Sequence, residues 1–296
     1  MDTIKHDILD TVPRPIVGKA LELTDVDDLH PHAHRKSQLL YVVGGVITVT
    51  AASGMWTVPP SCAIWIPGGC VHAAHVVGTA SIRCLYLEPE IAASLQADCG
   101  IVFVQPLLRE LILRFVAGPL LYNTDDSREA RLVSVLTDEL NTAPEEPLYL
   151  PMPTDRRLRR IVELCLGDPT LRLTIDEWGA RVGASNRTLS RLFSEQTGMS
   201  FVKWRQQLHV GLALQKLAAR ESVTNIAIDL GYESTSAFIA MFKRTMGTTP
   251  SRYFADEVRS DGAATGRKGL LSGPNVVAFP RRPKRKAPEA GSGTPT

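Results

Sequence analysis

The chain has 296 residues, of which 44% are hydrophobic and 22% are charged, and its formal net charge is +2. This length is typical of about two domains, and the composition excludes collagen-like, coiled-coil and wholly disordered chains. No run of about 18 apolar residues occurs and the first residues lack an apolar signal segment, so we expect neither a membrane span nor a secreted protein.

The charge is unevenly distributed along the chain. Residues 1–154 carry 10 basic and 18 acidic side chains, whereas residues 155–256 carry 15 and 10, and residues 257–296 carry 8 and 3. A basic second half favours a polyanionic partner such as nucleic acid. The five cysteines are odd in number and are never spaced C-x-x-C, which fits a protein of the reducing cytoplasm.

The first part of the chain has the pattern of a β domain. Residues 36–88 contain short runs rich in β-branched and aromatic residues, such as 39–43 and 82–87, with glycine and proline between them. Strands that recur every 8–12 residues or so, with turn signals between them, predict a sandwich or a barrel. We therefore assign residues 1–95 to a β-barrel domain.

The period changes after the predicted strands. Apolar residues recur at three and four over residues 102–141, which predicts two amphipathic helices and a helical segment over 96–141. Residues 142–154 carry four prolines and are expected to be a linker of restricted flexibility. Residues 257–296 are rich in Gly, Ser, Pro and basic residues, and we expect a disordered basic tail. Two interpretations of its charge stay open: counterion release on a polyanion such as DNA, or a solvated terminus.

Residues 155–256 contain an internal repeat. Each copy has the pattern of a short helix, a turn with glycine and a second helix, which is a helix-turn-helix. A capping box at residues 174–177 opens the first copy, and Ala180 and Ala227 are small where the helices of a unit must approach. Four positions of the first copy recur 48 residues later: Ile175, Trp178, Val182 and Gly183 match Val223, Ile226, Leu230 and Gly231.

One helix is predicted between the two copies, over residues 201–218, with a single apolar stripe. Eighteen residues at about 1.5 Å each span roughly 27 Å. Successive major-groove faces on one side of B-DNA lie about 34 Å apart, so this helix could hold two recognition helices near that spacing.

Residues 155–254 resemble the paired helix-turn-helix domain of the AraC/XylS family of transcription regulators. The first matching segment is Ser185-Asn-Arg-Thr-Leu-Ser-Arg-Leu-Phe193, and the second runs from Ala227 to Tyr253. The resemblance implies an all-α DNA-binding domain over 155–256 that binds double-stranded promoter DNA in the cytoplasm. It also implies RNA polymerase as a partner if the protein is an activator.

The resemblance also implies which side chains meet DNA. It places Arg187, Ser190 and Arg191 where the first recognition helix contacts base edges, and Arg is suited to bidentate contact with guanine. Thr235 and Ser236 take the corresponding positions of the second helix.

The second helix departs from the family pattern. An Arg is usual where Ala240 stands, so we expect this unit to read bases weakly and to position the protein on the DNA backbone. The residues expected to contact phosphates are Ser234, Lys243 and Arg244.

The front domain carries a histidine pattern. His32 and His34 with Gln38, followed by Pro67-Gly-Gly-Cys-Val-His72, resemble the two short motifs of the cupin β-barrel. Three imidazoles could bind a divalent metal ion, but Gln38 stands where the family has a better ligand, Glu. Three interpretations stay open: a pocket for a small-molecule effector, a metal site, or histidines without a ligand. A thiol sensor made of Cys62, Cys70 and Cys84 is a further alternative.

The fold class that follows is α+β: a cupin-like barrel, two helices, and an all-α double helix-turn-helix domain. The two helices of 96–141 resemble the pair that mediates dimerisation in such regulators, although their apolar stripes could equally pack on their own barrel. We expect a bacterial, ligand-responsive transcription regulator and not an enzyme. The alternatives are a metal-dependent cupin enzyme with a helical accessory domain, and a protein-interaction module.

Overall fold

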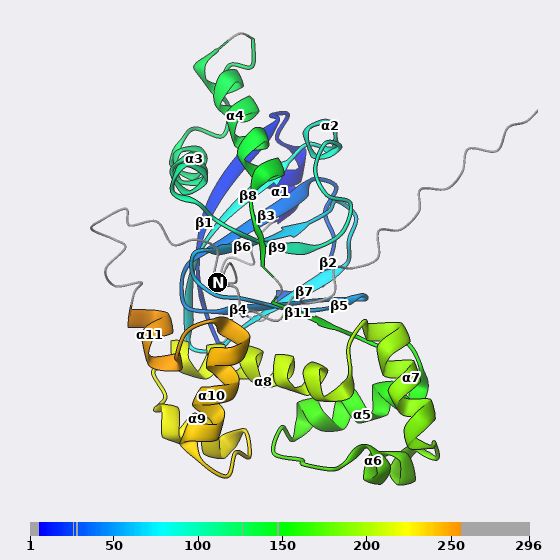
Figure 1. Cartoon of the computed structure of the whole chain (residues 1–296). Helices are drawn as coiled ribbons and strands as arrows, with labels where there is room; N and C mark the ends of the chain where they lie inside the picture. Colours follow the sequence, from blue (N-terminus) through cyan, green and yellow to red (C-terminus); the bar gives the residue numbers. More distant parts are fainter. Residues whose placement is uncertain (1–5, 26, 28, 126, 147, 256–296) are drawn as a thin grey trace, which may run out of the picture.

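The computed structural model describes residues 6–25, 27, 29–125, 127–146 and 148–255, and it confirms the α+β architecture. Two antiparallel sheets face each other and enclose an apolar core (Figure 1). In order across the first sheet, sheet A, are β1 (Ile16–Thr24), β8 (Thr79–Leu87), β3 (Ser37–Gly44), β6 (Cys62–Ile66), β9 (Gly100–Phe103) and β10 (Glu145–Glu146). Across the second, sheet B, are β11 (Tyr149–Pro151), β5 (Gly54–Val58), β4 (Ile47–Ala51), β7 (His72–Val76) and β2 (Leu29–His32).

The proline-rich segment 142–154 is not only a connection between domains. Its strand β10 pairs with β9, and its strand β11 pairs with β5, so it adds one strand to each sheet. The physical reason is the run Leu148-Tyr-Leu150, whose two leucines are buried against the barrel and the helical domain. The predicted disordered tail, residues 257–296, lies outside the described residues.

The two helices after the barrel cover the outer face of sheet A. Helix α3 (Pro106–Ala117) begins at a proline, and residues 100–103 of the segment predicted to be helical form strand β9 instead. Helix α4 (Arg128–Thr142) starts at the N-cap Ser127. Their buried faces pack on sheet A in one apolar cluster with Leu39, Trp65 and Leu85, so the apolar stripes serve this chain's own barrel. Leu107 and Val135 stay exposed on the helices.

Seven helices form the second half of the described chain, and Figure 1 shows α8 lying below the barrel with one helix-turn-helix unit at each end. The glycines predicted in the two turns, Gly183 and Gly231, both have a positive φ, 68° and 72°, which only glycine adopts without strain. The helices are α5 (Arg156–Gly167), α6 (Ile175–Val182), α7 (Asn186–Thr197), α8 (Phe201–Ala218), α9 (Val223–Asp229), α10 (Thr235–Met246) and α11 (Pro250–Ala255).

One small-residue position was assigned wrongly from the sequence. Gly179, not Ala180, lies where α6 meets the following turn: a Cβ on Gly179 would come within 2.4 Å of the carbonyl oxygen of Ala184. Ala180 is exposed, whereas Gly179 and Ala227 are buried at equivalent positions of the two units. The capping box of Thr174 and Glu177 is present as predicted.

Helix α8 also joins the two halves of the molecule. Gly211 faces β5 so closely that a Cβ there would lie 2.8 Å from the Thr57 hydroxyl oxygen. One turn later Gln215 donates a hydrogen bond of 2.5 Å from its amide to the hydroxyl of Thr48 on β4. At the other end of α8 the Trp204 indole N–H donates to the carbonyl of Pro151 in β11, at 2.9 Å. The helical half of the chain is therefore in direct contact with sheet B.

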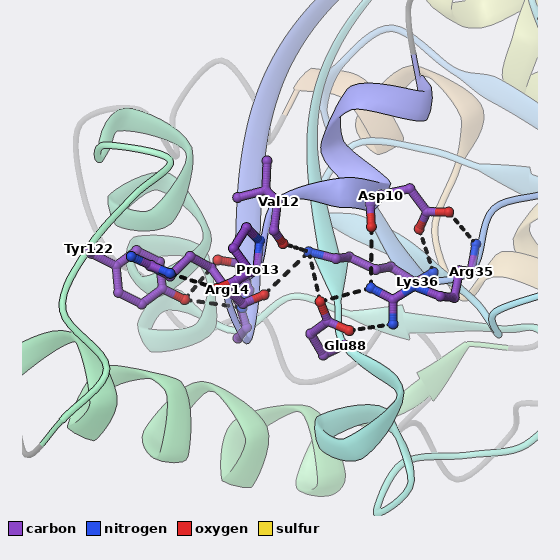
Figure 2. Close-up of polar contacts among 9 residues, drawn as sticks. Asp10, Val12, Pro13, Arg14, Arg35, Lys36, Glu88 and Tyr122 are labelled. Carbon is purple, nitrogen blue, oxygen red and sulfur yellow. Dashed lines mark hydrogen bonds and ion pairs between the residues drawn. The ribbon is translucent and has the colours of Figure 1, made fainter.

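A fully buried lysine holds the N-terminal segment against the barrel (Figure 2). The Nζ atom of Lys36 donates to the carbonyls of Val12 and Arg14, at 2.6 and 3.3 Å, and lies 3.3 Å from a carboxylate oxygen of Glu88. The carboxylate of Asp10, in α1 (His6–Thr11), accepts hydrogen bonds from the backbone N–H groups of Arg35 and Lys36. Desolvation lowers the pKa of Lys36, and its ion pair with Glu88 opposes that effect.

We predict that Lys36→Met lowers the free energy of unfolding by about 1–3 kcal/mol, because it leaves the carbonyls of Val12 and Arg14 without their donor, while Glu88 keeps its ion pair with Arg35. Arg35→Met is the matched control: Arg35 also pairs with Glu88, but its side chain is 53% exposed, so little change is expected. Thermal and urea unfolding of both variants measure the difference. Equal effects of the two substitutions would contradict the role assigned to Lys36.

Candidate ligand site and DNA interface

Three histidines meet at one end of the barrel, as the sequence predicted. His32 ends β2 and is the direct cross-strand partner of His72, which begins β7. His34 follows in the turn to β3. The ring centroids lie 4.4 Å apart for His32 and His72, 5.1 Å for His34 and His72, and 6.0 Å for His32 and His34.

The backbone orients all three rings in the same way. The Nδ1 atoms of His32, His34 and His72 lie 2.8, 2.5 and 2.9 Å from the carbonyl oxygens of His30, Lys36 and Cys70. A carbonyl only accepts, so Nδ1 carries a proton in all three rings and the lone pair of a neutral ring is on Nε2. In His34 this Nε2 also faces an acceptor, Oε1 of Gln38, so an ion can bind there only when the Gln38 amide turns over. Backbone carbonyls that accept from Nδ1 orient metal-binding histidines in the same way.

The spacing of the three rings also fits a metal ion. One ligand nitrogen from each histidine can be chosen so that all lie within 4.8 Å of one another. Around a tetrahedral ion with bonds of about 2.0–2.1 Å, the nitrogens would be about 3.4 Å apart, so small side-chain adjustments close the site. Burial has the largest effect on His72 and lowers its pKa to about 4, although the hydrogen bond with the Cys70 carbonyl opposes it. The ring is therefore neutral and able to bind a cation near neutral pH.

Gln38 lies beside the histidines, and both ends of its side-chain amide already have partners. Its Oε1 is 3.2 Å from Nε2 of His34, while its amide nitrogen donates to the hydroxyl of Tyr86 at 3.2 Å and contacts the sulfur of Cys84 at 3.4 Å. Gln38 is buried and neutral, so the negative charge that a glutamate would add to this site is missing. His30 and His75, which lie in the same two segments of the chain, are exposed.

The space next to the cluster is small. The cavity lined by His32, His72 and Gln38 has a volume of about 10 Å³, enough for one water molecule or one ion. Drug-sized organic ligands occupy pockets of roughly 300–1,000 Å³. In this structure the cavity at the histidines matches an ion in size and is smaller than the pocket of a drug-sized ligand.

A larger cavity, of about 300 Å³, lies on the outer face of sheet A. Sequence analysis did not predict this site, because its walls come from separate segments that meet only in the fold. Apolar residues from the sheet and polar residues from the loop before β9 and from the end of α4 line it together. They are Leu39, Trp65, Ser94, Leu95, Gln96, Val102, Leu140, Asn141, Ala143 and Glu145.

The predicted base-reading side chains of the first unit are exposed on one helix. Arg187, Ser190 and Arg191 all project from α7 into solvent. Arg191 forms an ion pair with Glu195 one turn later, at 2.6 Å, and both side chains are more than half exposed. An exposed pair of this kind is worth less than about 1 kcal/mol, so it leaves Arg191 available to DNA.

The second unit presents fewer polar groups. Ser236 is exposed on α10 and Thr235 is partly buried, and the exposed Ala240 adds no donor. Ser234 caps the helix by accepting a hydrogen bond from the N–H of Ala237 at 3.2 Å, so its hydroxyl has a structural task as well. Lys243 and Arg244 are exposed in the last turn of α10.

His209, to which the sequence assigned no role, connects the two units inside the helical domain. It is buried in α8, with Nδ1 3.1 Å from the hydroxyl of Tyr232 and Nε2 3.2 Å from the carbonyl of Pro169. Burial, with a smaller contribution from Arg205, lowers the pKa of His209 to about 4. The sequence gave no signal for this, since Pro169 and Tyr232 lie 40 and 23 residues away.

A β-barrel that holds a buried cluster of three histidines is joined to two helix-turn-helix units. This combination defines a DNA-binding regulator with a sensor domain. Family models agree with this division: an AraC-like ligand binding domain matches residues 21–150, and a helix-turn-helix domain matches residues 178–256. The chain belongs to the AraC/XylS family of transcription regulators.

Individual relatives support the family assignment. The HTH-type transcriptional regulator NimR of Escherichia coli is 40% identical over 224 residues, which cover 76% of this chain and 81% of NimR. RipA of Corynebacterium glutamicum is 32% identical over 108 residues, 36% of this chain and 33% of that protein.

Solved structures with partial similarity include ToxT and the DNA-binding domain of the global transcriptional factor AdpA. ToxT of Vibrio cholerae, bound to an unsaturated fatty acid, has a TM-score of 0.34 at 14% identity over 80% of this chain and 94% of ToxT. The DNA-binding domain of AdpA in complex with a target DNA has a TM-score of 0.34 at 26% identity and covers 37% of this chain and 100% of that domain. No helix in the described ranges is both long and apolar enough to cross a membrane.

We predict that His209 makes folding sensitive to mild acid. Its native pKa of about 4 lies below the ordinary 6.5, so the stabilisation is fully present above pH 6.5 and is lost as the pH falls toward 4. At pH 5 the loss is about 2 kcal/mol from this residue. His209→Gln should flatten the pH dependence of helix unfolding measured by circular dichroism, relative to wild type and to the surface variant His75→Gln. A variant slope equal to that of wild type would refute the assignment.

Proposed function

We propose that this regulator binds promoter DNA by placing α7 and α10 in successive major grooves. The observation that carries the proposal is the duplicated unit: two equivalent helices, each with an exposed polar face, are held at opposite ends of the 18-residue helix α8. A helix of this length spans roughly 27 Å, close to the rise of one turn of B-DNA. We propose residues 155–256 as the DNA-binding domain. The sensor barrel, assigned to residues 1–95 from the sequence, also includes β9, β10 and β11, and of the segment 96–141 only α3 and α4 form a helical extension.

The two units divide the work of recognition. Arg187 and Arg191, one turn apart on α7, are proposed to read bases, with Ser190 between them. Thr235 and Ser236 at the start of α10 contribute hydroxyl contacts. Side chains proposed to contact phosphates, and so to fix the register on DNA, are Ser234, Lys243 and Arg244.

The ligand proposed for the histidine cluster is a divalent metal ion. Three rings whose Nδ1 atoms face backbone carbonyls, beside a cavity of about 10 Å³, support an ion over an organic effector. Imidazole ligands favour Zn²⁺ and related transition metals. His32, His34 and His72 would hold the ion, and Gln38 would supply a weak neutral ligand at most.

Binding in the barrel would reach the DNA-binding domain through sheet B. β7, which starts at His72, pairs with β4, and Thr48 of β4 accepts the hydrogen bond from Gln215 of α8. A ligand changes DNA affinity only if it binds two arrangements of these parts with different affinity. We propose that a ligand at His72 favours one of two arrangements of the connection that runs from β7 through β4 to α8.

Other roles are proposed on narrower grounds. The small cavity leaves no room for an organic substrate beside an ion, which supports a sensor over a cupin enzyme. The exposed Leu107 and Val135 on α3 and α4 support a homodimer through these helices. A promoter-binding protein acts in the cytoplasm of a bacterium, and as an activator it would also contact RNA polymerase.

We predict that Arg187→Ala and Arg191→Ala each weaken binding to operator DNA by about 1–3 kcal/mol, a loss of roughly 5- to 150-fold in affinity, because each removes a bidentate contact. Binding to random DNA should change much less. Arg128→Ala, which removes an exposed arginine from α4, is the charge-matched control. Mobility shifts at constant salt measure both. The assignment of base readers fails if the variants lose operator and random binding equally.

We predict that Zn²⁺ raises the melting temperature of the metal-free wild type, with a stabilisation of about 2.7 kcal/mol at a hundred times the Kd. His34→Ala should abolish the shift, because it removes a ligand whose ring is fixed by the Lys36 carbonyl. His75→Ala, at an exposed position of β7, should keep it. Competition with a chelator and elemental analysis of untagged protein check the stoichiometry. A shift that persists in His34→Ala would exclude the cluster as the site.

A further inference from the structure

Two cysteines from distant parts of the chain meet at neighbouring strand ends. Cys70 lies in the loop between β6 and β7, and Cys99 directly precedes β9, which pairs with β6. Their sulfur atoms are 3.7 Å apart, at van der Waals contact, and both residues are partly exposed. Sequence analysis grouped Cys70 with Cys62 and Cys84, because Cys99 reaches it only through the pairing of β9 with β6.

The other three cysteines have a different environment. Cys62, Cys84 and Cys165 are buried in apolar cores. Desolvation raises the pKa of the Cys84 thiol to about 12 and that of Cys165 to about 11. Buried thiols of this kind are inert, because an oxidant cannot reach them and the reactive thiolate does not form.

The backbone holds the loop of Cys70 in place. The N–H of Gly69 donates to the carbonyl of His34 at 2.8 Å, and the N–H of Gly68 donates to the hydroxyl of Ser37 at 3.0 Å. A Cβ on Gly68 would lie only 2.2 Å from the carbonyl oxygen of Arg35, so the loop sits directly on the chain beneath it. The position of Cys70 is therefore set by the barrel.

The segment before Cys99 is held as well. The indole N–H of Trp65 donates to the carbonyl of Gln96 at 2.8 Å, and Trp65 is the cross-strand partner of Gly100. Both sulfurs thus project from anchored backbone. Closing the distance from 3.7 Å to the roughly 2.05 Å of a sulfur–sulfur bond requires side-chain rotation and small loop adjustments.

We propose that Cys70 and Cys99 form an oxidation site that hydroperoxides convert to an intramolecular disulfide. One thiol attacks the peroxide, the O–O bond breaks, and a sulfenic acid and one water form. The sulfur of the second thiol then attacks the sulfenic sulfur and displaces its hydroxyl group, which leaves as water with the thiol proton. Two thiols and one hydrogen peroxide give one disulfide and two waters, and a dithiol reductant reverses the bond by exchange.

A stoichiometric oxidation tests the site in the full chain. After one equivalent of hydrogen peroxide, alkylation under denaturing conditions should count three thiols in place of five, and dithiothreitol should restore five. Peptide mapping of wild type should find the peptides of Cys70 and Cys99 linked within one chain. The melting temperature of the barrel should rise by about 5 °C or more, because the bond closes a loop of about 30 residues.

Variants separate this pair from the other cysteines. Cys70→Ser and Cys99→Ser should each abolish the linked peptide and leave the melting temperature unchanged by peroxide. Cys165→Ala, which removes a buried thiol of the helical domain, should still form the link. Five thiols after oxidation of wild type, a link between two chains, or the same two-thiol loss in Cys99→Ser would each overturn the proposal. Because mapping of wild type needs no variant, a folding defect in one of them does not obscure the result.

Discussion

Helix α8 must bury its surface on three sides at once, and the arrangement of the whole molecule depends on that requirement. Phe201, Trp204 and Leu208 complete the apolar core of the first helix-turn-helix unit, while Val210, Ala213 and Leu214 belong to a cluster shared by the second unit and the barrel. The third side lies on sheet B, where Gly211 removes the side chain that would strike Thr57. A helix packed on three sides is fixed in rotation, and so are α7 and α10, which are attached to it.

The histidine cluster depends on the backbone in a similar way. The carbonyls that orient the rings come from His30, Lys36 and Cys70, and two of these residues are themselves anchored. Lys36 is fixed by its buried amine, and Cys70 by the loop that rests on residues 34–37. The geometry of the three rings is therefore set by the N-terminal segment and by the loop after β6, neither of which contributes one of the imidazoles.

Sequence analysis predicted most of the architecture, because the patterns involved are local. The strands of 36–88, both helix-turn-helix units, the turn glycines and the cluster of His32, His34 and His72 follow from short motifs. It predicted one apolar stripe on α8 and missed the buried face that carries Gln207 and His209. These two side chains are polar and become buried only through contacts made in the fold. β10 and β11 have two and three residues, too few to show a period. Cys99 and the outer cavity depend on strand register, which no local pattern encodes.

The strands β10 and β11 determine how the two halves can be separated. A cleavage site chosen at residue 141, where the proline-rich sequence begins, would remove the outermost strand from each sheet at once. The freed edges of β9 and β5 would expose unpaired N–H and C=O groups, and such edges pair readily with other molecules. A soluble isolated sensor therefore has to end beyond Pro151. Such a cut still breaks the hydrogen bond between the Trp204 indole and the Pro151 carbonyl.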